Sequence, residues 1–108
     1  MEELDLQLLC QEISKKYFHK EFHHQITYNS RLKSSGGRYI LKTSNIEINP
    51  KVENILGKEV LIGVIKHELC HYHLHQEGKG YRYQDRDFKM LLREVGGHRF
   101  VERMEPYR

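Results

Sequence analysis

Residues 67–71 read His-Glu-Leu-Cys-His, and this pattern constrains the fold because a helix brings its two histidines onto one face. A helix turns by roughly 100° per residue, so His67 and His71 would lie about 40° apart and project from one face. Glu68 would lie about 80° from this pair, too far round to join the same ligand set but well placed to reach a water molecule on a metal. The motif therefore predicts one zinc ion per chain at His67 and His71, with Glu68 as a general base.

The residues around the motif favour a buried helix. Leu61, Ile65 and Leu69 recur at four-residue spacing, with Ile62 beside them and Tyr72 following. They would form an apolar flank that faces away from the histidines, whereas an ordinary histidine-rich surface helix would have polar flanks. We expect this helix to run from about residue 58 to 76 and to stop at Gly78.

The length and composition indicate one small domain over residues 1–108. The chain has 108 residues, of which 38% are hydrophobic and 31% charged, so its core is lean and a bound metal could add to its stability. It has no apolar run near the roughly 18 residues that span a bilayer. The first residues, Met1–Asp5, are acidic where a signal peptide would be basic and then apolar. We therefore expect a cytoplasmic protein that makes no membrane contact.

Two cysteines, Cys10 and Cys70, are too few for a disulfide framework, so we expect two free thiols. Cys70 lies inside the motif, about 60° from His67 on the helix surface. It could reach the metal only by distorting the site.

The net charge of +3 is unevenly distributed, and residues 15–42 form a basic stretch. Such a surface, in which positive charges alternate with aromatic rings, often contacts nucleic acid, but it is also typical of an ordinary solvated helix and hairpin. The residues concerned are Lys15, Lys16, Lys20, Arg31, Lys33, Arg38 and Lys42, with Tyr17, Phe18, Phe22, Tyr28 and Tyr39 between them.

The remaining pattern predicts an α+β fold. Apolar spacing indicates a first helix over residues 3–18, and strand-forming segments follow at 22–28, 38–42 and 45–49, which we expect to form an antiparallel sheet. A short helical turn over 51–56 would precede the motif helix. Asp85 is a candidate N-cap for a last helix that ends at Gly96-Gly97.

This order of elements and several of its motifs resemble the bacterial SprT-like proteins, over nearly the whole chain. The matching segments are Gly36-Gly37-Arg38-Tyr39, Ile46-Glu47-Ile48-Asn49-Pro50, the run from His67 to His75, Gly80-Tyr81-Arg82, Asp85, Asp87-Phe88-Lys89, Gly96-Gly97 and Arg99-Phe100. The resemblance implies a minimal zincin-like domain in which His67 and His71 bind zinc and Glu68 is catalytic. SprT-like domains are related to the metalloprotease domain of Spartan, which degrades proteins crosslinked to DNA.

The resemblance thus implies a zinc metalloprotease that hydrolyses peptide bonds with an activated water, on protein or peptide substrates, with DNA-associated proteins among the candidates. An edge strand at 38–42 or 45–49 could bind the extended substrate. Any DNA contact would rest on the basic stretch, because these 108 residues contain no cysteine-rich zinc ribbon of the kind that follows the domain in many members. The alternative function is a non-catalytic, zinc-stabilised domain that binds nucleic acid as an accessory module.

The third zinc ligand stays open at this point. Catalytic zinc sites usually have three protein ligands, and many SprT-like proteins carry a histidine where this chain has Tyr83. A straight helix would carry His75 away from the pair, and His98 could reach it only if the chain folds back at Gly96-Gly97. The candidates are Tyr83, Asp85, His75 and His98.

Overall fold

The computed structural model describes residues 1–99, and these form helices and one small sheet, which confirms the α+β class. The helices and strands are, in chain order, α1 (Glu3–Ile13), the π-helical segment η1 (Ser14–Phe18), β1 (Ile26–Tyr28), β2 (Gly37–Ile40), β3 (Asn45–Ile48), the π-helical segment η2 (Val52–Leu56), α2 (Lys58–Gln76) and α3 (Arg86–Val95).

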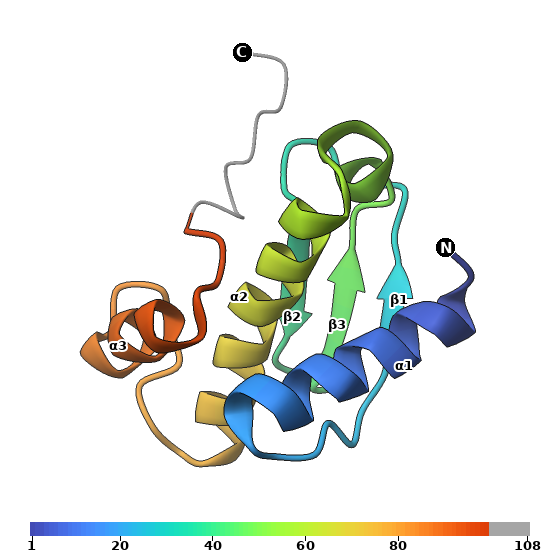
Figure 1. Cartoon of the computed structure of the whole chain (residues 1–108). Helices are drawn as coiled ribbons and strands as arrows, with labels where there is room; N and C mark the ends of the chain where they lie inside the picture. Colours follow the sequence, from blue (N-terminus) through green and yellow to red (C-terminus); the bar gives the residue numbers. More distant parts are fainter. Residues whose placement is uncertain (100–108) are drawn as a thin grey trace.

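Helices α1 and α2 cover one face of the sheet, and α3 packs against α2 (Figure 1). The core lies between the two helices and the sheet. It includes Leu6 and Cys10 of α1, Ile46 and Ile48 of β3, and Leu61, Ile65 and Leu69 of α2. The apolar flank expected for residues 58–76 is therefore confirmed, and so are the bounds of that helix. On the other face of the sheet, Arg38 Nε lies 2.6 Å from Glu47 Oε1.

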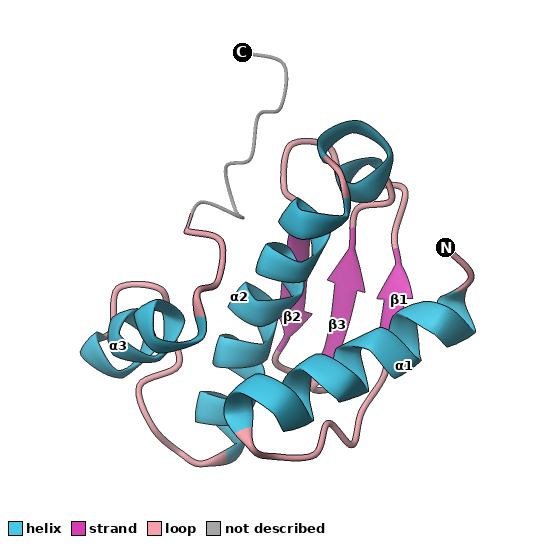
Figure 2. Ribbon diagram, viewed as in Figure 1, coloured by secondary structure: helices cyan, strands magenta, loops and turns pink. Residues whose placement is uncertain are grey.

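The sheet is mixed, so the prediction of an antiparallel sheet was wrong (Figure 2). Its strand order is β1-β3-β2, with β2 antiparallel to β3 and β1 parallel to it. The prediction assumed that strands consecutive in sequence are neighbours, which is the usual arrangement. Here residues 29–36 carry the chain past the place that β3 later fills, and the tight turn at 41–44 then returns β3 between the other two strands.

Asn49, directly after β3, holds this connection in place. Its buried Nδ2 donates to the main-chain carbonyls of Leu32 and Ser35 at 3.0 and 3.1 Å, and its Oδ1 accepts from the backbone of Lys51 at 3.0 Å. One amide group thus ties the 29–36 connection to the start of η2. Strand β3 lies in the centre of the sheet, so residues 45–49 are not a free edge that could bind an extended substrate. Strand β2 is an edge strand.

The first strand is shorter than the expected segment 22–28 because its first residues pack against α2 instead. Phe22 contacts the ring of Tyr72 at 4.7 Å between centroids, and the Tyr72 hydroxyl bonds the backbone of His23 and the imidazole of His24. These contacts replace a sheet partner until the ladder begins at Ile26.

Candidate metal and catalytic site

Helix α2 presents His67 and His71 from the same face, as the motif predicted. Their ring centroids lie 5.1 Å apart at 62°, and His67 is fully buried while His71 is half-buried. Glu68, between them in sequence, is only 1% exposed. The structure therefore brings the two predicted ligands together beside a buried carboxylate.

Main-chain carbonyls fix the orientation of both imidazoles. His67 Nδ1 lies 2.6 Å from the carbonyl oxygen of His98, and His71 Nδ1 lies 2.6 Å from that of Tyr81. A carbonyl oxygen can only accept a hydrogen bond, so Nδ1 carries the proton in each ring. In the neutral form the lone pair then lies on Nε2, which is the arrangement found in most histidines that bind a metal.

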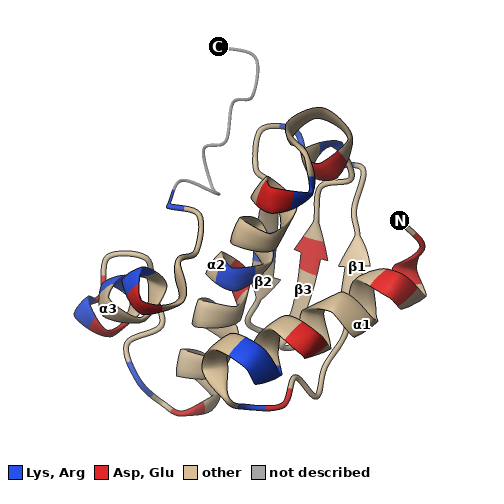
Figure 3. Cartoon of the chain, in the orientation of Figure 1, with Lys and Arg blue, Asp and Glu red and all other residues tan. Residues whose placement is uncertain are grey.

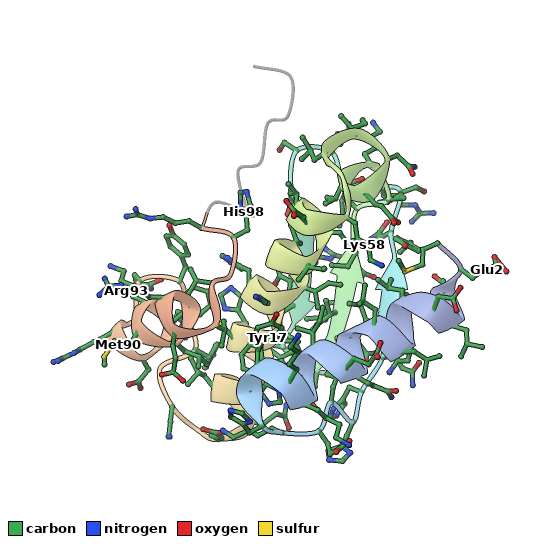
Figure 4. The ribbon with its side chains drawn as sticks, viewed as in Figure 1. Glu2, Tyr17, Lys58, Met90, Arg93 and His98 are labelled. Atoms are coloured by element: carbon green, nitrogen blue, oxygen red, sulfur yellow. The ribbon has the colours of Figure 1, made fainter. Side chains whose placement is uncertain are left out.

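The carbonyl group that contacts His67 belongs to the segment 96–98. This segment folds back from the end of α3 onto α2. His98, which Figure 4 labels, lies in this segment, and it donates its backbone N–H to the carbonyl of Gly63 at 2.8 Å. The approach is close enough to need glycine: a Cβ on Gly97 would lie 2.5 Å from Leu92 Cδ1 and 3.3 Å from the backbone nitrogen of His67. We call residues 96–98 the strap.

Sequence reasoning treated Gly96-Gly97 as a helix end and as the point where a fold-back could bring the His98 side chain to the pair, but it missed the role of the backbone of this segment beside the histidines. Gly96 does end α3 in the left-handed conformation, with φ of 72°. The missed signal was Gly63, a glycine inside an otherwise apolar helix, which often marks a close approach of another backbone. A Cβ on Gly63 would lie 3.2 Å from the Cβ of His98.

The carbonyl for His71 comes from the loop between α2 and α3, which two aspartates hold. Asp87 Oδ2 accepts from the backbone of Gly80 at 2.9 Å, and Asp85 Oδ2 accepts from that of Arg82 at 3.0 Å. Asp85 occupies the N-cap position of α3, as expected, but its side chain makes no capping hydrogen bond to the helix. It instead positions the loop whose Tyr81 carbonyl orients His71.

The structure places each of the four third-ligand candidates in a different environment. His75 Nδ1 lies 2.6 Å from the Tyr39 hydroxyl, and Asp85 bonds the loop. The strap does fold back as the His98 alternative required, but it is the main-chain carbonyl of His98 that meets His67. The Tyr83 ring stacks near-parallel to His67, with centroids 6.1 Å apart.

The donor groups that the structure describes fit the first two ligands of a zinc site. Within residues 1–99, no cluster of three or more His, Cys, Asp or Glu side chains is arranged to hold a metal ion. Two correctly oriented imidazoles thus stand together, and the third ligand remains unassigned.

Both cysteines are free thiols, as predicted, and lie in the core. Burial raises the pKa of Cys70, and the negative charges of Glu68 and Glu94 raise it further. Since a metal is bound by the thiolate, a fully buried and protonated Cys70 is a core residue.

Phenylalanine 88 of α3 forms the apolar wall of the site. Its ring stacks on His71 at 4.2 Å between centroids and meets His67 edge-on at 5.1 Å. It is fully buried, so α3 shields the histidines from solvent on this side.

The basic stretch 15–42 does not form a single aromatic and cationic surface. Phe18 and Phe22 are buried in the core. Several of the charges form ion pairs, namely Lys15 with Glu21, Lys20 with Glu77 and Arg38 with Glu47, and acidic residues lie among the basic ones (Figure 3). Core packing therefore explains those two aromatic residues, and the DNA contact stays a prediction.

None of the helices within residues 1–99 is long and apolar enough to cross a bilayer.

Comparisons with known proteins identify the family. A model described as the SprT-like family matches residues 6–106. The chain is 57% identical over 100 residues to "Protein SprT-like" of Bacillus subtilis (strain 168), which covers 93% of this chain and 67% of that protein. It is 52% identical over 104 residues to the protein of the same name from Bacillus cereus (strain G9842), covering 96% of this chain and 68% of that protein.

A third relative, from Geobacillus sp. (strain WCH70), is 55% identical over 100 residues, which cover 93% of this chain and 64% of that protein. No solved structure matched the chain, so the zincin-like class stays a prediction. On the family match over residues 6–106 and on these identities, the chain belongs to the SprT-like family.

Proposed function

We propose that this chain binds one zinc ion through His67 and His71 and hydrolyses peptide bonds with Glu68 as the general base. The observation that carries the proposal is the pair of carbonyl contacts, from His98 and Tyr81, that fix the Nδ1 proton of both imidazoles. A histidine kept only for packing needs no such matched arrangement on two successive helical turns. The second observation is that the buried Glu68 lies between them in sequence.

Zinc supplies Lewis-acid chemistry when bound, polarising a carbonyl and making water easier to deprotonate. The remaining roles belong to side chains of this protein. The Glu68 carboxylate accepts a proton from the attacking water and passes it to the leaving amine. Phe88, stacked on His71, excludes solvent from one side of the imidazoles and so strengthens the local electrostatic interactions.

The edge strand β2 supports a mode of substrate binding. It packs against α2 and, within residues 1–99, has β3 as a strand neighbour on one side only. An extended peptide that pairs with its open edge would run beside the helix that carries the site. A structure with a bound peptide lying elsewhere would remove this part of the proposal.

We extend the proposal to DNA-associated proteins as substrates, because of the family's relation to Spartan. The alternative is a non-catalytic, zinc-stabilised domain that binds nucleic acid, in which the metal would be held in a closed site without an open position for water. Hydrolysis of protein substrates with and without DNA, measured for the wild type and for Glu68→Gln, separates the two functions.

The first experiment is elemental analysis of protein purified without a histidine tag. We expect about one zinc per chain in the wild type and its loss in His67→Ala, with His23→Ala as a matched control, since His23 is an exposed histidine outside the pair. Absence of metal from the wild type after incubation with zinc would contradict the proposal.

A further inference from the structure

A pocket of about 380 Å³ lies between α3, the strap and the loop before α3. Its apolar walls include Tyr83, Phe88 and Leu92, and Lys89, Arg93 and Arg99 also line it. Lys89 and Arg93 are one helical turn apart on α3 and both are exposed (Figure 4 labels Arg93).

The pocket shares two walls with the histidine pair. Tyr83 stacks on His67 at 6.1 Å, and Phe88 stacks on His71 at 4.2 Å between ring centroids. Any group that enters the pocket is therefore separated from the two imidazoles by the ring of Tyr83 or of Phe88. Consecutive Cα atoms are about 3.8 Å apart, so in a peptide held at the histidines only residues close to the cleaved bond can reach this pocket.

The charge of the pocket is positive. None of the residues within 1–99 that line it is acidic. Within residues 1–99, neither Lys89 nor Arg93 forms an ion pair with a carboxylate. Two cations that no carboxylate of the described residues neutralises, at an apolar hollow, attract an anion and repel another cation.

We infer that this pocket binds an acidic side chain of the substrate, glutamate or aspartate, next to the bond that is cleaved. The inference rests on the proposed peptidase function and names its substrate class. A glutamate fits both features of the pocket: its methylene groups pack on Tyr83 and Leu92, and its carboxylate pairs with Lys89 or Arg93.

The observations favour a peptide side chain over single-stranded nucleic acid as the ligand. Nucleic acid is bound by a continuous positive groove with exposed aromatic rings on which bases stack. Here Phe88 is fully buried and serves as a wall, and the cations border one hollow.

The test uses peptides that are identical except for one position, occupied by Glu, Gln or Lys. Their binding to the zinc-loaded Glu68→Gln protein is followed by NMR titration of backbone amides, which measures weak affinities and reports where the peptide binds. The same titrations are made in that background with Lys89→Glu, Arg93→Glu and the control Arg86→Glu. Arg86 is exposed on the same helix and does not line the pocket, so the control changes the net charge equally.

We expect the Glu peptide to bind roughly fivefold to tenfold more tightly than the Lys peptide, with shifts at residues of the pocket. This preference should disappear in Lys89→Glu and Arg93→Glu and persist in Arg86→Glu. Equal affinities for the Glu and Lys peptides would overturn the inference. So would an equal loss of preference in Arg86→Glu, because the effect would then be long-range. A single-stranded oligonucleotide is titrated in the same way, and if Lys89→Glu and Arg93→Glu weaken its binding while the peptide affinities stay unchanged, the inference is also overturned.

Hydrolysis of the same peptides by protein that retains Glu68 tests the proposed function separately. If no peptide is cleaved faster than by Glu68→Gln while the Glu preference in binding holds, the proposed function fails and the inference that the pocket binds an acidic side chain stands. If cleavage occurs with equal kcat/KM for the Glu and Lys peptides, and binding shows no preference either, the pocket fails and the function stands.

Discussion

The main-chain carbonyl of His98 lies 2.6 Å from Nδ1 of His67, so a residue beyond the last helix sets the orientation of a side chain in the middle of α2. The contact exists because Gly97 lets the strap approach the helix backbone.

Substitution of Gly97 should therefore weaken zinc binding. In Gly97→Val the added carbons would push the strap away from His67 and remove the carbonyl contact, which we expect to lower zinc affinity by about tenfold or more. Competition with a chromophoric chelator measures the change. Gly78→Asn is the control, since Gly78 has a left-handed φ of 69° and open space around it. Unchanged affinity in Gly97→Val would show that the strap does not position His67.

Substitution of Glu68 should separate catalysis from metal binding. Glu68→Gln keeps the shape of the side chain but cannot accept the proton, so we expect hydrolysis to fall by at least about a hundredfold. Zinc content and thermal unfolding should stay close to wild type. Activity that survives this change would exclude Glu68 as the general base.

Tyr83 is the third-ligand candidate that can be tested most directly. Tyr83→His introduces an imidazole next to His67, and we expect it to raise zinc affinity by roughly tenfold or more. Tyr83→Phe keeps the ring that stacks on His67 and removes only the hydroxyl. A lower zinc affinity in Tyr83→Phe would identify the phenol as a ligand, and an unchanged affinity would exclude it.

The buried pair of Ser14 and His73 should make stability depend on pH. Ser14 Oγ donates to the carbonyl of Lys20 at 2.7 Å, so it accepts from His73 Nε2, also at 2.7 Å. Burial lowers the pKa of His73 to about 4, and the positive charges of Lys20 and His23 add to this.

Because the folded pKa lies below the unfolded value of about 6.5, the unfolded chain gains this proton first on acidification. Stability should therefore fall as the pH drops from about 6.5 towards 4, by up to about 1.4 kcal/mol for each pH unit. Urea unfolding of metal-free protein at several pH values measures it. His73→Gln should flatten the dependence, whereas His19→Asn, at an exposed position that does not contribute to the shift of the His73 pKa, should leave it steep. An equally steep dependence in His73→Gln would exclude His73 as the cause.

The sequence was most informative where one local pattern decides the structure. The apolar spacing from Leu61 to Tyr72 and the glycines on either side predicted α2 correctly from Lys58 to Gln76, and with it the shared face of His67 and His71. The strand order was not accessible in this way. It depends on how residues 29–36 pass β3 and on the three hydrogen bonds that the Asn49 amide makes to Leu32, Ser35 and Lys51.

The groups that orient the two histidines were not predicted, for a related reason. The groups that hold the imidazoles are main-chain carbonyls, which every residue has, so His98 and Tyr81 carry no side-chain signal for this role. Only the glycines that permit the close approach, Gly63 and Gly97, marked the place.

The two carbonyls also set the order in which the site can be completed. Helix α2 contains both proposed ligands and the proposed general base, but the groups that orient the histidines lie in the loop before α3 and in the strap after it. A chain that has folded only as far as Gln76 has the imidazoles without their fixed direction. Under the proposed function, binding of metal in the right geometry is coupled to the docking of α3, so the site matures only when that helix is in place.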